Sequence, residues 1–535
     1  MTAEKKSKSE AEEMLREIEK PTIETKDVPL RLPGRESIAA LRRVNEELRE
    51  QTNLPRYYVR GGELVRIRYN EDGRMTIQEM GVDAAMHELT HAADYFATPA
   101  KGDPKLVFPP KDVARYVLSA RTFSFPRLTG ITAIPVFRPD GTVVTERGYD
   151  SATSLIYDPP TGFAVSVPEK PKKTDVKRAL KLISELMGDF PYADQASLAN
   201  TLALALTPIL REVIDGPVPL AAIDKPTPGS GATLLVESLA IATSGTEPGA
   251  LGAVEDDNEM RKAITAKMRT GERWLFLDNI NVELKSAALA RALTAGIWED
   301  RILGVSKTLS VPVRNVWVAT ANNLELSIEI ARRSYWIRLD AQLEKPWERP
   351  AEKFTHPDLK AWTRQNRSEI LSALLTLGRY WFVKSQPAAK DVPVMGSFEA
   401  WSKTLGGVLA TAGVEGFLEN SRALYEKAIS HSGLWAGFLE VWHEKYGSTG
   451  TTASQVAEDL QGIGDADFRE VLPDEFSLTD DNLSRKLGRA FGKHEGVRYG
   501  ADGYHLAKVG ERKRAVLWSV YRSDSPDAAT TKPRL

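Results

Sequence analysis

The chain has 535 residues, a formal net charge of −2 and no cysteine. This length suggests three or four domains, and so small a charge leaves no overall basic field to hold the protein on nucleic acid. The absence of cysteine excludes disulfides and thiolate zinc sites and fits a reducing cytosol. No apolar run approaches the roughly 20 residues that span a bilayer, and the first residues are charged rather than apolar. We therefore expect a cytoplasmic protein with no membrane partner.

The N-terminal third of the chain predicts a charged tail followed by a mixed α+β domain. Residues 1–50 are rich in Lys, Glu and Arg and predict a tail with one or two exposed helices. Residues 51–170 contain two alternating stretches centred on turns, "YYVRGGELVRIRY" and "ITAIPVFRPDGTVVTERGYD". Each predicts a β-hairpin. We expect this domain to form a collar or to dock a partner.

The same domain contains the zinc-peptidase pattern His-Glu-x-x-His in "MHELTHAADYF". On a helix, His87 and His91 share one face, as zinc requires, with Glu88 placed as a base. A third ligand has only Asp94 and Glu146 as nearby candidates, and neither has a familiar spacing. We therefore expect a histidine pair without metal, and a zinc peptidase is the least favoured function.

From residue 171 strands and helices alternate. Helices are expected over 174–214, and the apolar strands are 219–224, 273–277, 316–320 and 335–339. Strands that alternate with helices indicate a parallel sheet in an α/β domain, here 171–345. Residues 346–446 predict a helical segment, and residues 447–535 predict a small helical domain ending in a hairpin.

The stretch "AAIDKPTPGSGATLLVES" (221–238) joins the first of these strands to a helix and has the form of a phosphate-binding loop. Glycines let successive backbone N–H groups face an anion at a helix N-terminus. Thr233 stands where a hydroxyl would bind Mg²⁺, but Ala232 replaces the usual lysine and Pro226 the first glycine. Taken alone, the loop favours a plain glycine turn. The nucleotide-binding candidates are Pro228, Gly229, Ser230, Gly231, Ala232, Thr233 and Leu234.

Polar residues at the ends of later strands favour a phosphate-binding site over a plain glycine turn. Asp278 ends the strand in "RWLFLDNIN" and is a second candidate Mg²⁺ ligand. Asn322 ends "NVWVATANN", where an amide can orient an attacking water, and Arg332 and Arg333 precede the strand in "IARRSYWIRLD". Each residue also has an ordinary structural explanation: Asp278 as a cap after a strand, Asn322 as part of a turn, and the two arginines as partners in surface ion pairs. Together, in this order, they predict a site for ATP and Mg²⁺.

Residues 174–340 resemble an AAA+ ATPase core, and more closely the helicase-type ATPases of phages, plasmids and integrated elements, which are related to the superfamily 3 and MCM-like helicases. The resemblance implies that Asp278 and Asn279 form the acidic motif, that Asn322 is sensor 1, and that Arg332 or Arg333 is an arginine finger. It also implies that Lys307, in "GVSKTLS", grips single-stranded DNA from a hairpin tip. Residues 129–158 and 396–420 resemble other segments of these proteins.

The resemblance implies an ATP-dependent DNA helicase that replicates a phage, plasmid or mobile element in the cytoplasm of a bacterial host. It implies a homo-oligomeric ring, expected to be a hexamer, with single-stranded and duplex DNA as partners and a separate primase or initiator. The alternative is an origin-binding or regulatory AAA+ ATPase that assembles on DNA without unwinding it.

Two positions depart from the family pattern. Asn279 stands where many relatives have a catalytic glutamate, so the base comes from elsewhere, with Glu255, Asp256 and Glu259 as candidates. Ala232 has three explanations: an introduced Lys→Ala change, a naturally inactive ATPase, or replacement of the charge by Lys225. We favour the first, because the other parts needed for turnover are present, and Lys225 lies on the strand side of two prolines. We expect weakened nucleotide binding and almost no hydrolysis.

The C-terminal segment 481–521 predicts a helix followed by a two-stranded hairpin, and it resembles the winged-helix tails of replicative helicases. Its basic residues would contact DNA phosphates from the helix and the wing, and the alternative is a charged face that docks a protein. The DNA-binding candidates here are Arg485, Lys486, Arg489, Lys493, Lys508, Arg512, Lys513 and Arg514, with Arg498 just after the helix.

Overall fold

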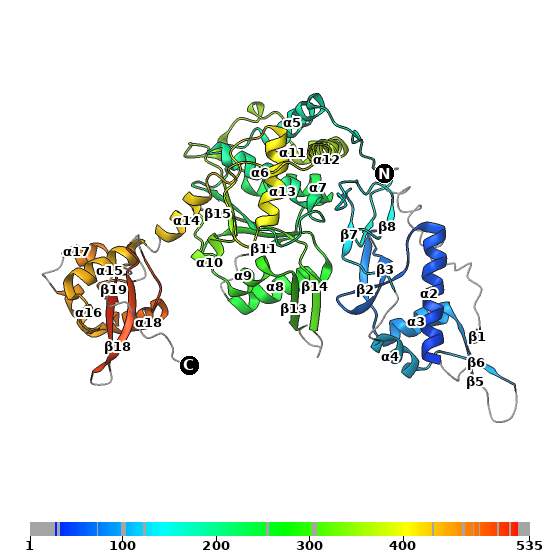
Figure 1. Ribbon diagram of the computed structural model, residues 1–535, viewed down its shortest axis with the longest axis horizontal. Coiled ribbons are helices and arrows are strands. Elements are labelled where there is room, and N and C mark those ends of the chain that lie inside the picture. The colour runs from blue at the N-terminus through cyan, green and yellow to red at the C-terminus, as the bar shows by residue number, and fades with distance from the viewer. Residues whose placement is uncertain are drawn as a thin grey trace. The chain divides into compact units, whose positions relative to one another are not determined.

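The computed structural model describes residues 27–28, 33–71, 73–97, 103–120, 125–252, 256–301, 308–430, 433–462, 466–473, 476–480, 482–499, 502–512 and 515–522. The fold is mixed α/β, as the sequence predicts, and it divides into two compact units, Met1–Ser421 and Arg422–Leu535 (Figure 1). Each unit is described by itself. No helix in the described ranges is long and apolar enough to cross a membrane.

The N-terminal part of the first unit packs three helices against short strands. Its helices are α2 (Pro33–Thr52), α3 (Val82–Ala92) and α4 (Lys111–Ser119), and its strands are β2 (Tyr57–Arg60), β3 (Glu63–Tyr69) and β4 (Met75–Glu79) in one sheet and β1 (Asp27–Val28), β5 (Asp94–Ala97) and β6 (Lys105–Val107) in another. The hairpin predicted around Gly61 is confirmed as β2–β3. Helix α2 buries Leu41 and Val44 in this core. The packed domain therefore begins before the expected boundary at residue 50.

The second predicted hairpin is present but short. Gly141 N donates to Arg138 O at 2.9 Å in the turn, Arg138 N donates to Thr142 O at 2.8 Å and Val144 N to Val136 O at 2.9 Å, on either side of an antiparallel bridge between Phe137 and Val143. The strands nearby are β7 (Gly130–Thr132), β8 (Gly148–Asp150) and β9 (Leu155–Tyr157), in the order β7-β9-β8. The first arm also contacts other elements: Phe137 N donates to Ile209 O at 3.0 Å, and the Phe137 ring packs on Phe382.

The centre of the first unit is a five-stranded parallel sheet in the order β11-β12-β15-β10-β16. The four strands predicted from apolar runs are confirmed as β10 (Leu220–Lys225), β12 (Trp274–Ile280), β15 (Val316–Asn322) and β16 (Ser334–Arg338). Strand β11 (Ala250–Leu251) was not predicted, because two residues are too few to show a sequence pattern. Every residue of β10 is buried, as expected for a strand with neighbours on both sides.

Helices cover this sheet, and the predicted helical stretch 174–214 is confirmed as two helices. They are α5 (Lys173–Met187) and α6 (Gln195–Leu210), followed along the chain by α7 (Ala232–Ser244), α8 (Asp257–Thr270), α9 (Ala287–Thr294), α10 (Ile328–Ala331), α11 (Leu359–Gln365), α12 (Arg367–Val383) and α13 (Glu399–Ala412). Turns of 3₁₀-helix, η1 (Pro346–Glu348) and η2 (Ala351–Lys353), lead from the sheet into α11. An antiparallel hairpin, β13 (Ile297–Arg301) and β14 (Thr308–Pro312), precedes β15.

The second unit has its own aromatic core. It contains α15 (Gly433–Tyr446), α16 (Ala453–Gln461), α17 (Ala466–Glu470), α18 (Leu483–His494) and an antiparallel sheet in the order β17 (Thr451–Thr452), β19 (Ala515–Tyr521), β18 (His505–Arg512); α14 (Ser421–Ser430) spans the boundary of the two units. Trp435 and Trp442 of α15 pack with Phe491 of α18. The predicted order of helix, strand and strand over 481–521 is confirmed.

Candidate functional site

The loop between β10 and α7 is shaped by two glycines in left-handed conformations. Gly229 has φ 78° and Gly231 has φ 93°. A Cβ on Gly229 would lie 3.0 Å from Trp347 Cε3, and one on Gly231 would lie 3.2 Å from Phe190 Cε1, so larger residues would be strained and crowded there. Ser230 is buried and donates to Thr227 O at 2.9 Å. The loop thus closes tightly at the first turn of α7, where unpaired backbone N–H groups favour an anion.

Asp278 lies beside this first turn. The pairing of β12 with β15 is irregular between Leu277 and Ile280, and Asn279 takes a left-handed φ of 52°. Such a bulge redirects a side chain. The Asp278 Oδ1 atom accepts a hydrogen bond from Thr233 Oγ1 at 3.0 Å. The structure therefore brings together Thr233 and Asp278, which lie 45 positions apart in the chain.

Thr320 completes this arrangement and was missed in the sequence. Its hydroxyl donates to Asp278 Oδ1 at 2.6 Å and accepts from Asn279 N at 2.9 Å, so it holds the bulge in place. A signal was present, because Thr320 is a polar residue inside the apolar strand "NVWVATANN". Such a residue, buried in a parallel sheet, requires a hydrogen-bond partner.

The end of β10 lies next to the side-chain oxygens of Asp278 and Thr320. Lys225 is only 7% exposed, and it is paired in register with Asn322 of β15. Burial lowers the pKa of the Lys225 ammonium, and the negative charges of Asp278 and Asp224 oppose that shift. Asp224 Oδ1 accepts from Leu324 N at 2.7 Å, which shapes the turn after Asn322. Asn322 itself is exposed at this edge.

The grouped oxygens suit a hard divalent cation. Mg²⁺ prefers oxygen ligands and is often held by one or two protein groups together with phosphates and waters. Thr233 and Asp278 offer such a pair, at the mouth of an anion-binding turn. Across the described ranges, no cluster of three or more His, Cys, Asp or Glu residues could hold a metal ion. A cation held by Thr233 and Asp278 would complete its shell with waters or with the oxygens of a bound anion.

The two candidate finger arginines lie at the opposite edge of the sheet. They directly precede β16, and Arg333 O accepts from Leu220 N at the start of β10, whereas the loop follows the end of β10. Both arginines pair with Glu329: Arg333 at 2.7 Å with a side chain that is 12% exposed, and Arg332 at 3.8 Å with a side chain that is 60% exposed. The structure thus does not bring either arginine to the loop of its own chain.

The remaining candidates in the first unit are not joined to the loop by any contact that the structure describes. Glu259, in the first turn of α8, pairs with Lys262 of the same helix. Asp256 caps α8 by accepting from Asn258 N and Glu259 N. Glu255 and Lys307 lie outside the described residues. No base for activating water is identified by these positions.

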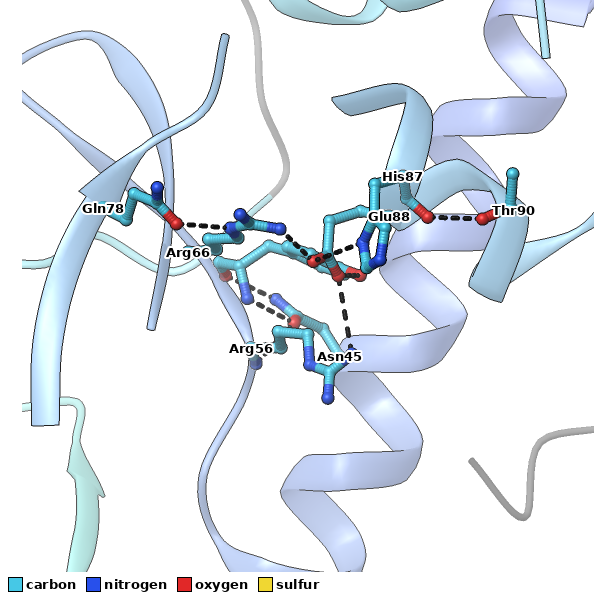
Figure 2. Close-up of polar contacts among 8 residues, drawn as sticks. Asn45, Arg56, Arg66, Gln78, His87, Glu88 and Thr90 are labelled. Carbon is cyan, nitrogen blue, oxygen red and sulfur yellow. Dashed lines mark hydrogen bonds and ion pairs between the residues drawn. The ribbon is translucent and has the colours of Figure 1, made fainter. Parts of the chain in front are cut away.

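The His-Glu-x-x-His segment lies in helix α3, but its glutamate is held by ion pairs and a hydrogen bond inside the domain. Glu88 is 4% exposed, forms an ion pair with Arg66, lies 3.4 Å from Arg56 Nη1 and accepts from Tyr57 Oη at 2.7 Å (Figure 2). His87 Nδ1 lies 3.6 Å from the same carboxylate. A carboxylate engaged by two arginines is a poor general base, so this geometry does not support a peptidase.

Among the described basic residues of the second unit, some are held in ion pairs and others are exposed. Lys486 bonds to Asp480 at 2.7 Å and Lys508 to Glu511 at 3.0 Å, which reduces their contribution to a positive surface. Arg485 and Arg489 are exposed on α18, and Arg512 is exposed at the end of β18. Lys513 and Arg514 lie outside the described residues, as does the side chain of Lys493.

Comparisons with known proteins give only weak similarities. No model of a known family matches the chain, and no curated protein matches it. Among solved structures, the A form apo structure of the NrS-1 C-terminal region has 11% sequence identity and a TM-score of 0.37, covering 89% of this chain and 98% of that one. The apo structure of NrS-1 residues 305–718 has 11% identity and a TM-score of 0.31, covering 85% and 95%. Similarity at this level supports no inference about function.

Proposed function

We propose that this chain is the subunit of an AAA+ ATPase that translocates on single-stranded DNA as a replicative helicase of a phage, plasmid or mobile element. The observation that carries the proposal is the contact between Thr233 and Asp278 at the first turn of α7. It lies at the carboxyl edge of a parallel sheet, beside the strand at which the sheet order reverses, where α/β proteins bind ligands.

Each site residue has a separate role in the proposed hydrolysis of ATP. The N–H groups of the loop 228–234 bind the phosphates, and the oxygens of Thr233 and Asp278 hold Mg²⁺, which neutralises the charge that develops during phosphoryl transfer. Asn322, exposed at the same edge, orients the attacking water. Arg332 acts on the nucleotide of a neighbouring subunit, since it lies at the far edge of the sheet from its own loop.

DNA contacts are assigned to two further elements. The segment between β13 and β14, which includes Lys307 in the sequence, would contact single-stranded DNA. In the second unit, α18 followed by β18–β19 would act as a winged helix. Arg485 and Arg489 would contact duplex phosphates from α18, with Arg512, Lys513 and Arg514 on the wing. A hexameric ring would align these elements, and a separate primase or initiator would supply priming or loading.

ATP hydrolysis with and without single-stranded DNA tests the proposal. Because Ala232 lacks the usual charge facing the phosphates, we expect almost no turnover from this chain and DNA-stimulated turnover from Ala232→Lys. Loss of a preorganised charge of this kind typically costs a factor of about 10²–10³ in rate. If Ala232→Lys remains inactive with and without DNA, the proposed motor function is wrong.

Strand separation distinguishes the alternative, an origin-binding or regulatory ATPase. A helicase requires Ala232→Lys to unwind a forked duplex and to lose this activity when Lys307→Ala is added. An assembly switch would hydrolyse ATP on DNA and leave the fork intact.

A further inference from the structure

The loop lacks the lysine that would face the phosphates, yet a lysine ends the strand before it. In β10, Ile223 is paired in register with Thr320 of β15, and Lys225 is paired with Asn322. Register partners point to the same face of a sheet, as do residues two apart on a strand. The Thr320 hydroxyl donates to Asp278 Oδ1, the same oxygen that accepts a hydrogen bond from Thr233. Lys225 therefore leaves the sheet on the face that carries the candidate site.

The surroundings of Lys225 fit a cation directed into this site. Its side chain is nearly buried, and its charge acts on the carboxylates of Asp278 and Asp224. Asp224 is already engaged by Leu324 N. Within the described part of the chain, the Lys225 ammonium donates no hydrogen bond, so its three N–H groups remain available to a bound anion.

We propose that Lys225 replaces the missing loop lysine in phosphate binding, with its ammonium contacting the phosphates of the nucleotide held at the first turn of α7. This rests on the proposed nucleotide site. The charge comes from the strand rather than from the helix, so it reaches the phosphates from another direction than a lysine at position 232. We therefore assign Lys225 to the binding of Mg²⁺–ATP, while rapid turnover still requires the Ala232→Lys change.

A double-mutant cycle on the full chain tests this assignment. The affinity for Mg²⁺–ATP is measured by calorimetry for the chain, Lys225→Met, Ala232→Lys and the double variant. If Lys225 supplies the missing charge, Lys225→Met weakens binding at least about tenfold in the original chain, the size of one charge-assisted contact. In the Ala232→Lys background, the same change weakens binding less than about threefold, because the second lysine is present.

Two further variants separate charge from folding. Lys225→Arg keeps the positive charge and should retain affinity within about threefold of the original chain. Lys403→Met removes an exposed lysine of α13 and serves as the matched control, with no change expected. Thermal unfolding of all variants checks that the loop region remains folded.

Three results would overturn the proposal. Unchanged affinity in Lys225→Met would show that the ammonium does not reach the phosphates. An equal loss in both backgrounds would show that Lys225 only positions Asp278. If neither the original chain nor Ala232→Lys binds nucleotide, the proposed function itself fails, and this outcome is distinct from nucleotide binding that does not depend on Lys225.

Discussion

Among single residues, Glu88 couples the stability of the N-terminal domain to pH. Burial on its own raises the pKa of its carboxyl, but the hydrogen bond from Tyr57 and the charges of Arg56 and Arg66 outweigh burial and hold that pKa below its usual value. A lowered pKa in the folded state means that Glu88 stabilises the fold above its unfolded pKa. This stabilisation is lost as the pH falls through the folded pKa.

We expect Glu88→Gln to be less stable at neutral pH by about 3–5 kcal/mol, because Arg56 and Arg66 then lack a counter-charge. The difference from the original chain should shrink as the pH falls through the folded pKa of Glu88. Urea unfolding across a pH series measures this, with Glu50→Gln, an exposed position at the end of α2, as control. A difference in stability that does not vary with pH would contradict the assignment.

Among the elements, helix α18 allows a direct test of DNA binding, because it carries both exposed arginines and a lysine that is already paired. Arg489 is exposed, whereas Lys486 is held by Asp480. If α18 lies along duplex DNA, Arg489→Ala should weaken binding and reduce the slope of log affinity against log salt by about 1. Lys486→Ala should change the slope less, because its charge is already compensated. Fluorescence anisotropy of a labelled duplex, with the full chain at several salt concentrations, measures both slopes. Equal slopes for Arg489→Ala and the original chain would favour the protein-docking alternative.

For the whole molecule, the proposed function together with the position of Arg332 predicts that ATP hydrolysis depends on contact between neighbouring subunits. The start and end of β10 are separated by about 17 Å for a strand of this length, so the proposed function requires Arg332 to act on the nucleotide of a neighbouring subunit. In the Ala232→Lys background, Arg332→Ala and Asp278→Asn should each abolish turnover. Mixing the two variants should restore part of it, because some sites then combine an intact Asp278 with an intact Arg332. Phosphate release measures turnover, and native mass spectrometry confirms mixed rings. Mixed rings without any recovery would exclude Arg332 as the finger.

Much of the candidate site could be predicted from local patterns. The glycine loop after the first apolar strand indicated Thr233, and the carboxylate near the end of a second apolar strand indicated Asp278. Four of the five sheet strands were visible as apolar runs. Thr320 was missed because its role depends on a bulge in another strand. Glu88 was considered as a catalytic base because the sequence did not show that two arginines converge on it.

Local sequence patterns were enough to predict the alternation of strands and helices, and hence the parallel sheet, and the glycine loop after β10. These features depend on periodicity and backbone freedom within a few neighbouring residues. Which side chains meet became clear only in the folded chain: Asp278 contacts Thr233 and Thr320, and Lys225 lies on the same face of the sheet. The physical reason is that strand register and side-chain direction are set by packing between segments far apart in the chain, which no local pattern records.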